Sequence, residues 1–241
     1  MDEVSKMKVE IWSDIMCPFC YIGKRKFEQA LQEFDKRGAV EVEWHSFQLD
    51  PSIQHMPGKD VHTYLAEIKG KSREWSLQVH KQLTDTAKAV GLAYNFDIAV
   101  IANSFEAHRL IQLAKRHGRG DAAEERLFKA YFTEGKNVSD HTTLLSLGEE
   151  IGLDRKEVAQ MLTSGEFGDN VQADIEEARQ LGVNGVPFFV FDRKYAVAGA
   201  QSPEVFAQVL EKSFDEWNEK QQLTLVEDAP GNVCEIGGEC S

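Results

Sequence analysis

The most informative segment for the fold is Lys8-Val-Glu-Ile-Trp-Ser-Asp-Ile-Met-Cys-Pro-Phe-Cys20, because it joins a strand pattern directly to a pair of cysteines. Apolar and polar residues alternate at its start, which is typical of a short β-strand. Pro18 suits the first position of an α-helix, where the N–H that proline lacks would have no partner. The stretch therefore predicts a strand that leads, through Cys17, into a helix.

The residues that follow extend this pattern to a strand, a helix and a second strand. A helical run continues through Phe34 and stops at Gly38. Val40-Glu-Val-Glu-Trp44 then alternates as a strand does. A helix between two strands usually connects a parallel pair through a right-handed crossover, so we expect these two strands to be parallel.

The rest of the chain divides into a helical block and a return to strands. Apolar residues recur with a helical period over residues 60–182. Pro187-Phe-Phe-Val-Phe191 then forms a continuous apolar run typical of a buried strand, and a weaker strand follows. Ser202-Pro203 begins a last helix with an apolar face that reaches Trp217.

This order predicts an α/β protein with a thioredoxin-like fold and an all-helical insertion. We expect residues 1–59 and 183–220 to form the thioredoxin-like domain. Residues 60–182 would form the insertion, and residues 221–241 a flexible tail.

The composition and net charge of the chain exclude some classes of binding partner. The chain has 241 residues, a net charge of −13 and 42% hydrophobic residues, which is a globular composition. The acidic balance argues against nucleic acid or an anionic membrane as a partner. We find no apolar run long enough to span a membrane and no secretory signal at the N-terminus, so we expect a cytoplasmic protein.

The two cysteines of Cys17-Pro-Phe-Cys20 suit thiol–disulfide exchange. The start of a helix directs free backbone N–H groups at Cys17, which favours its thiolate, so we assign Cys17 as the nucleophile. Cys20 lies one turn further on and is assigned as the thiol that resolves the mixed disulfide. Phe19 carries no charge, so we expect a less oxidising couple than one with histidine there.

Two other interpretations of these cysteines remain open. They could provide half of a zinc site, completed by Cys234 and Cys240, or they could be inert buried residues. The spacing of five residues between Cys234 and Cys240 is wider than zinc sites usually have, so we predict no metal.

Several separated motifs resemble the DsbA family of thioredoxin-like oxidoreductases. Within that family they are most similar to the FrnE-type branch, which is related to the 2-hydroxychromene-2-carboxylate isomerases. The similarity covers residues 8–217, and its motifs are Cys17-Pro-Phe-Cys-Tyr-Ile-Gly-Lys-Arg-Lys-Phe27, Asn103-Ser-Phe-Glu-Ala-His-Arg-Leu110, Leu127-Phe-Lys-Ala-Tyr-Phe-Thr-Glu-Gly135, Gly185-Val-Pro-Phe-Phe-Val-Phe191 and Tyr195-Ala-Val-Ala-Gly-Ala-Gln201.

The resemblance implies a protein thiol-disulfide oxidoreductase with a cis peptide bond before Pro187, facing the dithiol. The backbone of Val186 would then pair with an extended substrate, and we place Pro18 and Phe19 in the same substrate-binding surface. Protein or small-thiol substrates are expected. No bound cofactor is expected, with glutathione or another thiol or disulfide as co-substrate.

Two further functions stay open at this stage. One is a glutathione-dependent isomerase or transferase that acts on an aromatic small molecule. The other is a non-catalytic redox-sensing or chaperone module. The isomerase relatives usually carry serine in place of the first cysteine, so the presence of both Cys17 and Cys20 favours dithiol chemistry.

Two more features lead to expectations. Cys234 and Cys240 are interpreted as a second redox pair, and three interpretations of it stay open: exchange with the first pair, a tail disulfide formed adventitiously, or two free thiols. The run Lys24-Arg25-Lys26 is interpreted as a solvated face of the helix.

Overall fold

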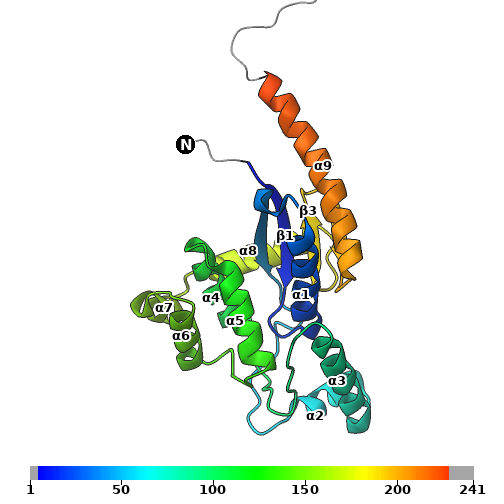
Figure 1. Ribbon diagram of the computed structural model, residues 1–241. Coiled ribbons are helices and arrows are strands. Elements are labelled where there is room, and N and C mark those ends of the chain that lie inside the picture. Colours follow the sequence, from blue (N-terminus) through cyan, green and yellow to red (C-terminus); the bar gives the residue numbers. More distant parts are fainter. Residues whose placement is uncertain (1–4, 228–241) are drawn as a thin grey trace, which may run out of the picture.

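The computed structural model of the chain describes residues 5–227, with side chains through Gln221 (Figure 1). Its elements are, in chain order, β1 (Met7–Ser13), α1 (Pro18–Glu33), the short 3-10 helix η1 (Arg37–Ala39), β2 (Val40–Ser46), α2 (Val61–Lys69), α3 (Arg73–Lys88), α4 (Phe105–Arg116), α5 (Gly120–Phe132), α6 (His141–Glu150), α7 (Arg155–Thr163), α8 (Gly168–Gln180), β3 (Phe188–Phe191), β4 (Tyr195–Ala198) and α9 (Pro203–Glu227).

The four strands of the described residues form one mixed sheet in the order β2-β1-β3-β4. Strands β1 and β2 are parallel, with Val9 opposite Val42, as the sequence predicts. Strand β3 runs antiparallel to β1, with Phe189 opposite Ile11. The predicted thioredoxin-like fold with a helical insertion is confirmed, because helices α2 to α8 all lie between β2 and β3 in the chain.

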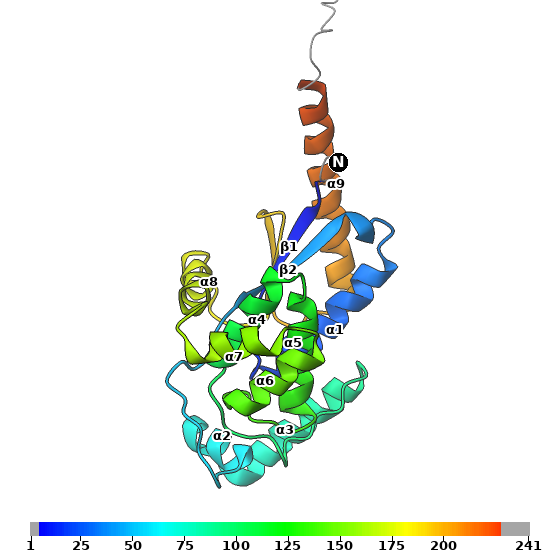
Figure 2. The same cartoon turned by 90° about the vertical axis from the view of Figure 1, so that its left-hand side faces the viewer.

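Helices cover both faces of the sheet, α1 and α9 on one side and α8 on the other (Figure 2). The alternation of side chains along a strand explains this arrangement. Phe189 packs with Phe27 of α1 and Phe206 of α9, with ring centroids 4.6 Å apart in the Phe189–Phe206 pair. Trp12 and Val190 point the other way and pack with Ala178 of α8.

The helical block has its own apolar core, and this core reaches the dithiol. It gathers buried residues from α4 to α7, such as Leu110, Phe128 and Val158, into one cluster with Cys17 and Cys20. The dithiol therefore lies where the first turn of α1 meets the helical block, and not inside the sheet layer alone.

The end of the chain differs from the prediction in one respect. Helix α9 continues past Trp217 to Glu227, so the boundary at residue 221 falls inside a helix. Cys234 and Cys240 lie outside the described residues. None of the helices that the structure describes combines the length and the apolar character needed to cross a membrane.

Candidate active site

Cys17 stands at the N-cap of α1, as predicted, and Pro18 occupies the first turn. The Cys17 N–H donates to the Asp14 carbonyl at 2.9 Å, and the Cys17 carbonyl accepts from the Cys20 N–H at 3.0 Å. Both cysteines are free thiols. The Cys17 sulfur therefore lies at a helix N-terminus, where unpaired N–H groups and the helix dipole favour negative charge.

The cis-proline loop faces the dithiol. The peptide bond between Val186 and Pro187 is cis, which confirms the expectation from the resemblance. The Cys17 thiol donates to the Val186 carbonyl across 3.4 Å, so residues 169 positions apart meet at the sulfur. Phe19 is 49% exposed beside them. The structure thus brings together the predicted residues Cys17, Phe19, Val186 and Pro187.

Cys20 is more deeply placed than Cys17, with 1% of its surface exposed against 4%. Burial raises the pKa of the Cys20 thiol well above its usual range, and the neighbouring Cys17 adds to the rise. The Ser13 hydroxyl and the Asp14 backbone N–H act in the opposite direction and lower that pKa. Cys20 is therefore a protonated, buried thiol. A resolving cysteine needs to stay in this state until the mixed disulfide on Cys17 has formed.

Sequence reasoning missed the residues that position the loop before Cys17. The Asp14 carboxylate accepts the Met16 N–H at 3.1 Å and the Leu49 N–H at 2.8 Å, which connects this loop to the segment that follows β2. His108 Nε2 lies 3.7 Å from the same carboxylate. The sequence did contain a signal for the role of Asp14, because the side chain of an Asp in a turn often accepts a hydrogen bond from the backbone N–H two residues later.

Tyr94 was also missed. Its hydroxyl, contributed by the helical block, donates to the Pro18 carbonyl at 2.7 Å and so fixes the first turn of α1. Tyr94 comes from a loop between α3 and α4, and no local pattern marks such a long-range contact.

The prediction that Lys24-Arg25-Lys26 forms a solvated face is wrong for Lys24, which is 1% exposed. Its ammonium pairs with Glu28 of its own helix and, on α5, lies 3.0 Å from Asp121 and 3.5 Å from Glu125. Arg25 pairs with Glu125 and Glu28 as well. These lysine and arginine side chains therefore attach α1 to the helical block, through acidic partners about 100 residues away.

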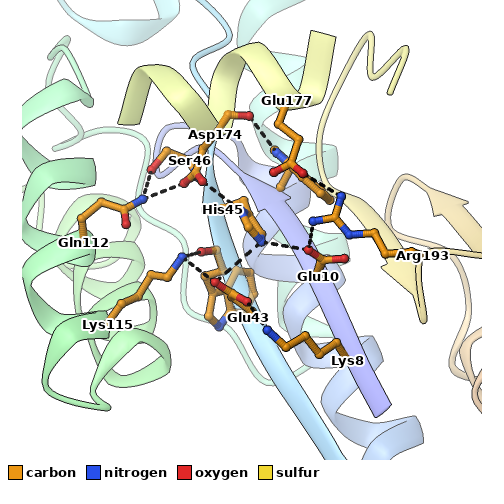
Figure 3. Close-up of polar contacts among 12 residues, drawn as sticks. Lys8, Glu10, Glu43, His45, Ser46, Gln112, Lys115, Asp174, Glu177 and Arg193 are labelled. Atoms are coloured by element: carbon orange, nitrogen blue, oxygen red, sulfur yellow. Dashed lines mark hydrogen bonds and ion pairs between the residues drawn. The ribbon is translucent and has the colours of Figure 1, made fainter. Parts of the chain in front are cut away.

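A second group of buried charges joins β1 and β2 to α8 (Figure 3). His45 Nδ1 lies 2.9 Å from Asp174, and its Nε2 lies 3.4 Å from Glu10. Asp174 also accepts the Ser46 N–H at 2.7 Å. Among the residues that the structure describes, the ligand atoms of two triplets are close enough together for a metal ion, namely Glu10–Glu43–His45 and His45–Asp174–Glu177.

The carboxylates of this group already have basic partners in the described structure. Arg193 pairs with Glu10 and, at 2.7 Å, with Glu177. Lys115 lies 3.2 Å from Glu43. The group is thus a charge-paired network that attaches α8 to the sheet.

Comparison with known proteins agrees with this geometry. Residues 8–211 match the family model described as a DSBA-like thioredoxin domain. The chain belongs to this family. Members of the DSBA-like family are generally thiol-disulfide oxidoreductases or isomerases.

Individual relatives of this DSBA-like chain span nearly its whole length. A probable DsbA oxidoreductase of Streptomyces coelicolor is 39% identical, with a TM-score of 0.81, and 95% of this chain and 94% of that one are covered. The uncharacterized protein YwbO of Bacillus subtilis is 28% identical over 84% of this chain and 94% of its own. The cytosolic disulfide reductase DsbM of Pseudomonas aeruginosa, solved with GSH, shares the fold at 19% identity, with a TM-score of 0.62 and coverage of 86% and 99%.

Proposed function

We propose that this chain is a thiol-disulfide oxidoreductase of the FrnE type that works in the cytoplasm through Cys17 and Cys20. The observation that carries the proposal is the placement of the Cys17 sulfur, at a helix N-terminus and 3.4 Å from the carbonyl that precedes the cis-proline. Cys20 is shielded directly behind it. Substrates are proteins or small thiols, and glutathione or another thiol serves as co-substrate.

The proposed reaction follows from the different environments of the Cys17 and Cys20 thiols. The Cys17 thiolate attacks one sulfur of a substrate disulfide, a Cys17–substrate disulfide forms, and the other substrate sulfur leaves as a thiolate. Cys20 then loses its proton and attacks the Cys17 sulfur, which releases the second substrate thiol. The substrate gains two electrons and two protons, and the enzyme is left with a Cys17–Cys20 disulfide. Two molecules of a thiol such as glutathione reduce it again and become one disulfide.

Reduction of insulin with glutathione as the electron source tests the proposal. We expect catalysed precipitation of the insulin B chain with the wild-type protein and none with Cys17→Ser, because the attacking thiolate is lost. Activity of Cys17→Ser close to that of the wild type would refute the assignment. Turnover of an aromatic small molecule with glutathione, without insulin reduction, would support the isomerase function instead.

We also propose that the C-terminal cysteines form a second redox pair. Cys234 and Cys240 follow α9 in the chain, and tethering raises the local thiol concentration to about the millimolar range only where the tether spans the distance between the two pairs. We expect the double variant Cys234→Ser/Cys240→Ser to shift the reduction potential or the glutathione-dependent turnover. An unchanged potential and turnover would mean that Cys17 and Cys20 act without them.

A further inference from the structure

The Phe19 N–H is a backbone donor that the Cys17 sulfur can use once it is a thiolate. An N-cap side chain accepts hydrogen bonds from the second and third residues of its helix, which in α1 are Phe19 and Cys20. The Cys20 N–H already donates to the Cys17 carbonyl at 3.0 Å, and Pro18 has no N–H. The Phe19 N–H has no acceptor within the part of the chain that the structure describes, so it remains for a negatively charged sulfur.

The other end of the same amide group accepts a hydrogen bond from Tyr94. The Pro18 carbonyl and the Phe19 N–H belong to one peptide unit, and the Tyr94 hydroxyl donates to this carbonyl at 2.7 Å. A hydrogen bond to the oxygen of an amide polarises the amide and strengthens a second hydrogen bond from its N–H, by about 10–30%. The Tyr94 hydroxyl therefore makes the Phe19 N–H a stronger donor.

The helical block holds Tyr94 in place for this contact. Its ring stacks on Phe132 of α5, with ring centroids 4.5 Å apart and 22° between the planes. The next residue, Asn95, donates its N–H to the Phe132 carbonyl at 2.7 Å. Burial raises the pKa of the Tyr94 hydroxyl, and the neighbouring Cys17 and Cys20 raise it further, so the hydroxyl stays protonated and can donate while thiols exchange.

We propose that Tyr94 is a positioning residue that activates Cys17 through the amide group between Pro18 and Phe19. The proposal rests on the proposed function and deepens it, because it assigns the helical block a part in the chemistry of the dithiol. The Cys17 thiol donates to the Val186 carbonyl across 3.4 Å. A thiolate cannot donate, and a carbonyl oxygen repels it. When the proton leaves, the sulfur therefore exchanges the Val186 carbonyl for the Phe19 N–H.

Tyr94→Phe tests the proposal, because phenylalanine keeps the stacked ring and removes the hydroxyl. Alkylation of Cys17 by iodoacetamide consumes the thiolate, needs no substrate and is measured at the Cys17 peptide by mass spectrometry from pH 4 to 10. In the acidic part of this series, where the thiolate fraction limits the rate, we expect Tyr94→Phe to react about twofold more slowly than the wild type. At the alkaline end it should react as fast or slightly faster, because a less stabilised thiolate is a better nucleophile.

Tyr195→Phe is the matched control. The Tyr195 hydroxyl donates to Glu216 of α9 at 2.6 Å, so this variant also loses one hydrogen bond of a tyrosine. Tyr195 lies on β4 opposite Phe191, at the end of β3 that is farther from Pro187. Its alkylation rates should equal those of the wild type at every pH.

Equal alkylation of Tyr94→Phe and the wild type across the series would overturn the Tyr94 proposal, even if both proteins reduce insulin. A rate lowered by the same factor at every pH would also overturn it, because that result indicates poorer access to the sulfur and not a weaker thiolate. The expected pH-dependent difference in a protein that does not reduce insulin would refute only the proposed function.

Discussion

Gly23 lies directly against Pro187, so closely that a Cβ atom on Gly23 would come within 2.9 Å of the Pro187 Cγ. The same Cβ would lie 3.5 Å from Ala200. The second turn of α1 therefore packs directly against the cis-proline loop. This contact sets the distance between the loop and the dithiol at the start of the same helix.

Gly23→Ala should displace the Pro187 loop and slow disulfide exchange. Overpacking of a close contact typically costs about 1–3 kcal/mol, so we expect a lower melting temperature and a several-fold loss of insulin reductase activity. Gly38→Ala is the matched control, because nothing lies within 4 Å of its Cβ position. Full activity of Gly23→Ala would show that the loop position does not matter for exchange.

Ser13→Ala should slow the second step of the reaction. The Ser13 hydroxyl is buried and has no hydrogen-bond partner within the described part of the chain, and it acts to lower the pKa of Cys20, which burial raises. A hydrogen bond from this hydroxyl to the Cys20 thiolate, a charged group, contributes about 1.5–3 kcal/mol, so without it the mixed disulfide on Cys17 should persist at least roughly tenfold longer. Quenched-flow mass spectrometry measures this lifetime.

The matched control for that experiment is Ser213→Ala, another buried serine without a described hydrogen bond, on α9. Its mixed disulfide should have the wild-type lifetime. A Ser13→Ala lifetime equal to that of the control would mean that the hydroxyl does not assist the Cys20 thiolate.

His45 should make the stability of the protein depend on pH. Burial acts to lower its pKa, but the hydrogen bond to Asp174 and the ion-pair contact with Glu10 outweigh burial and raise it to about 9 (Figure 3). The folded state therefore holds more protons than the unfolded state between about pH 6.5 and 9. The contribution of His45 is fully present below about pH 6.5 and is lost as the pH rises through 9.

Urea unfolding of wild type and His45→Gln from pH 6 to 9.5 measures this contribution. The difference in unfolding free energy between the two proteins should shrink by on the order of 3 kcal/mol as the pH rises. His141→Gln is the control, because His141 is exposed on α6. A difference that stays constant with pH would show that His45 is not charged in the folded protein.

The sequence was sufficient to predict those elements whose pattern lies within a few adjacent residues. Alternation over residues 8–13 and 40–44 and the apolar run from Pro187 predicted the strands, and Pro18 marked the start of α1. Cys17 could be placed at that start for the same reason, since the positions of a helix cap are read from adjacent residues.

The parts that could not be predicted depend on contacts between distant segments. Lys24 is buried because Asp121 and Glu125 approach from α5, and the run of basic residues around it resembles any solvated helix face. Gly23 is needed because Pro187 packs on it from 164 positions away. Met16 and Pro18 line an apolar cavity that exists only once α2 and α3 are in place, because these helices form much of its wall.

If Cys17 attacks the substrate and Cys20 resolves the mixed disulfide, the Cys20→Ser variant should trap the disulfide between Cys17 and the substrate. Reduced Cys20→Ser is incubated with insulin, quenched with acid and analysed by peptide mass spectrometry. We predict a stable disulfide between Cys17 and an insulin cysteine, and no adduct with Cys17→Ser. An adduct on Cys20 in the Cys17→Ser variant, or the absence of any adduct on Cys17 in the Cys20→Ser variant, would show that Cys17 is not the attacking cysteine.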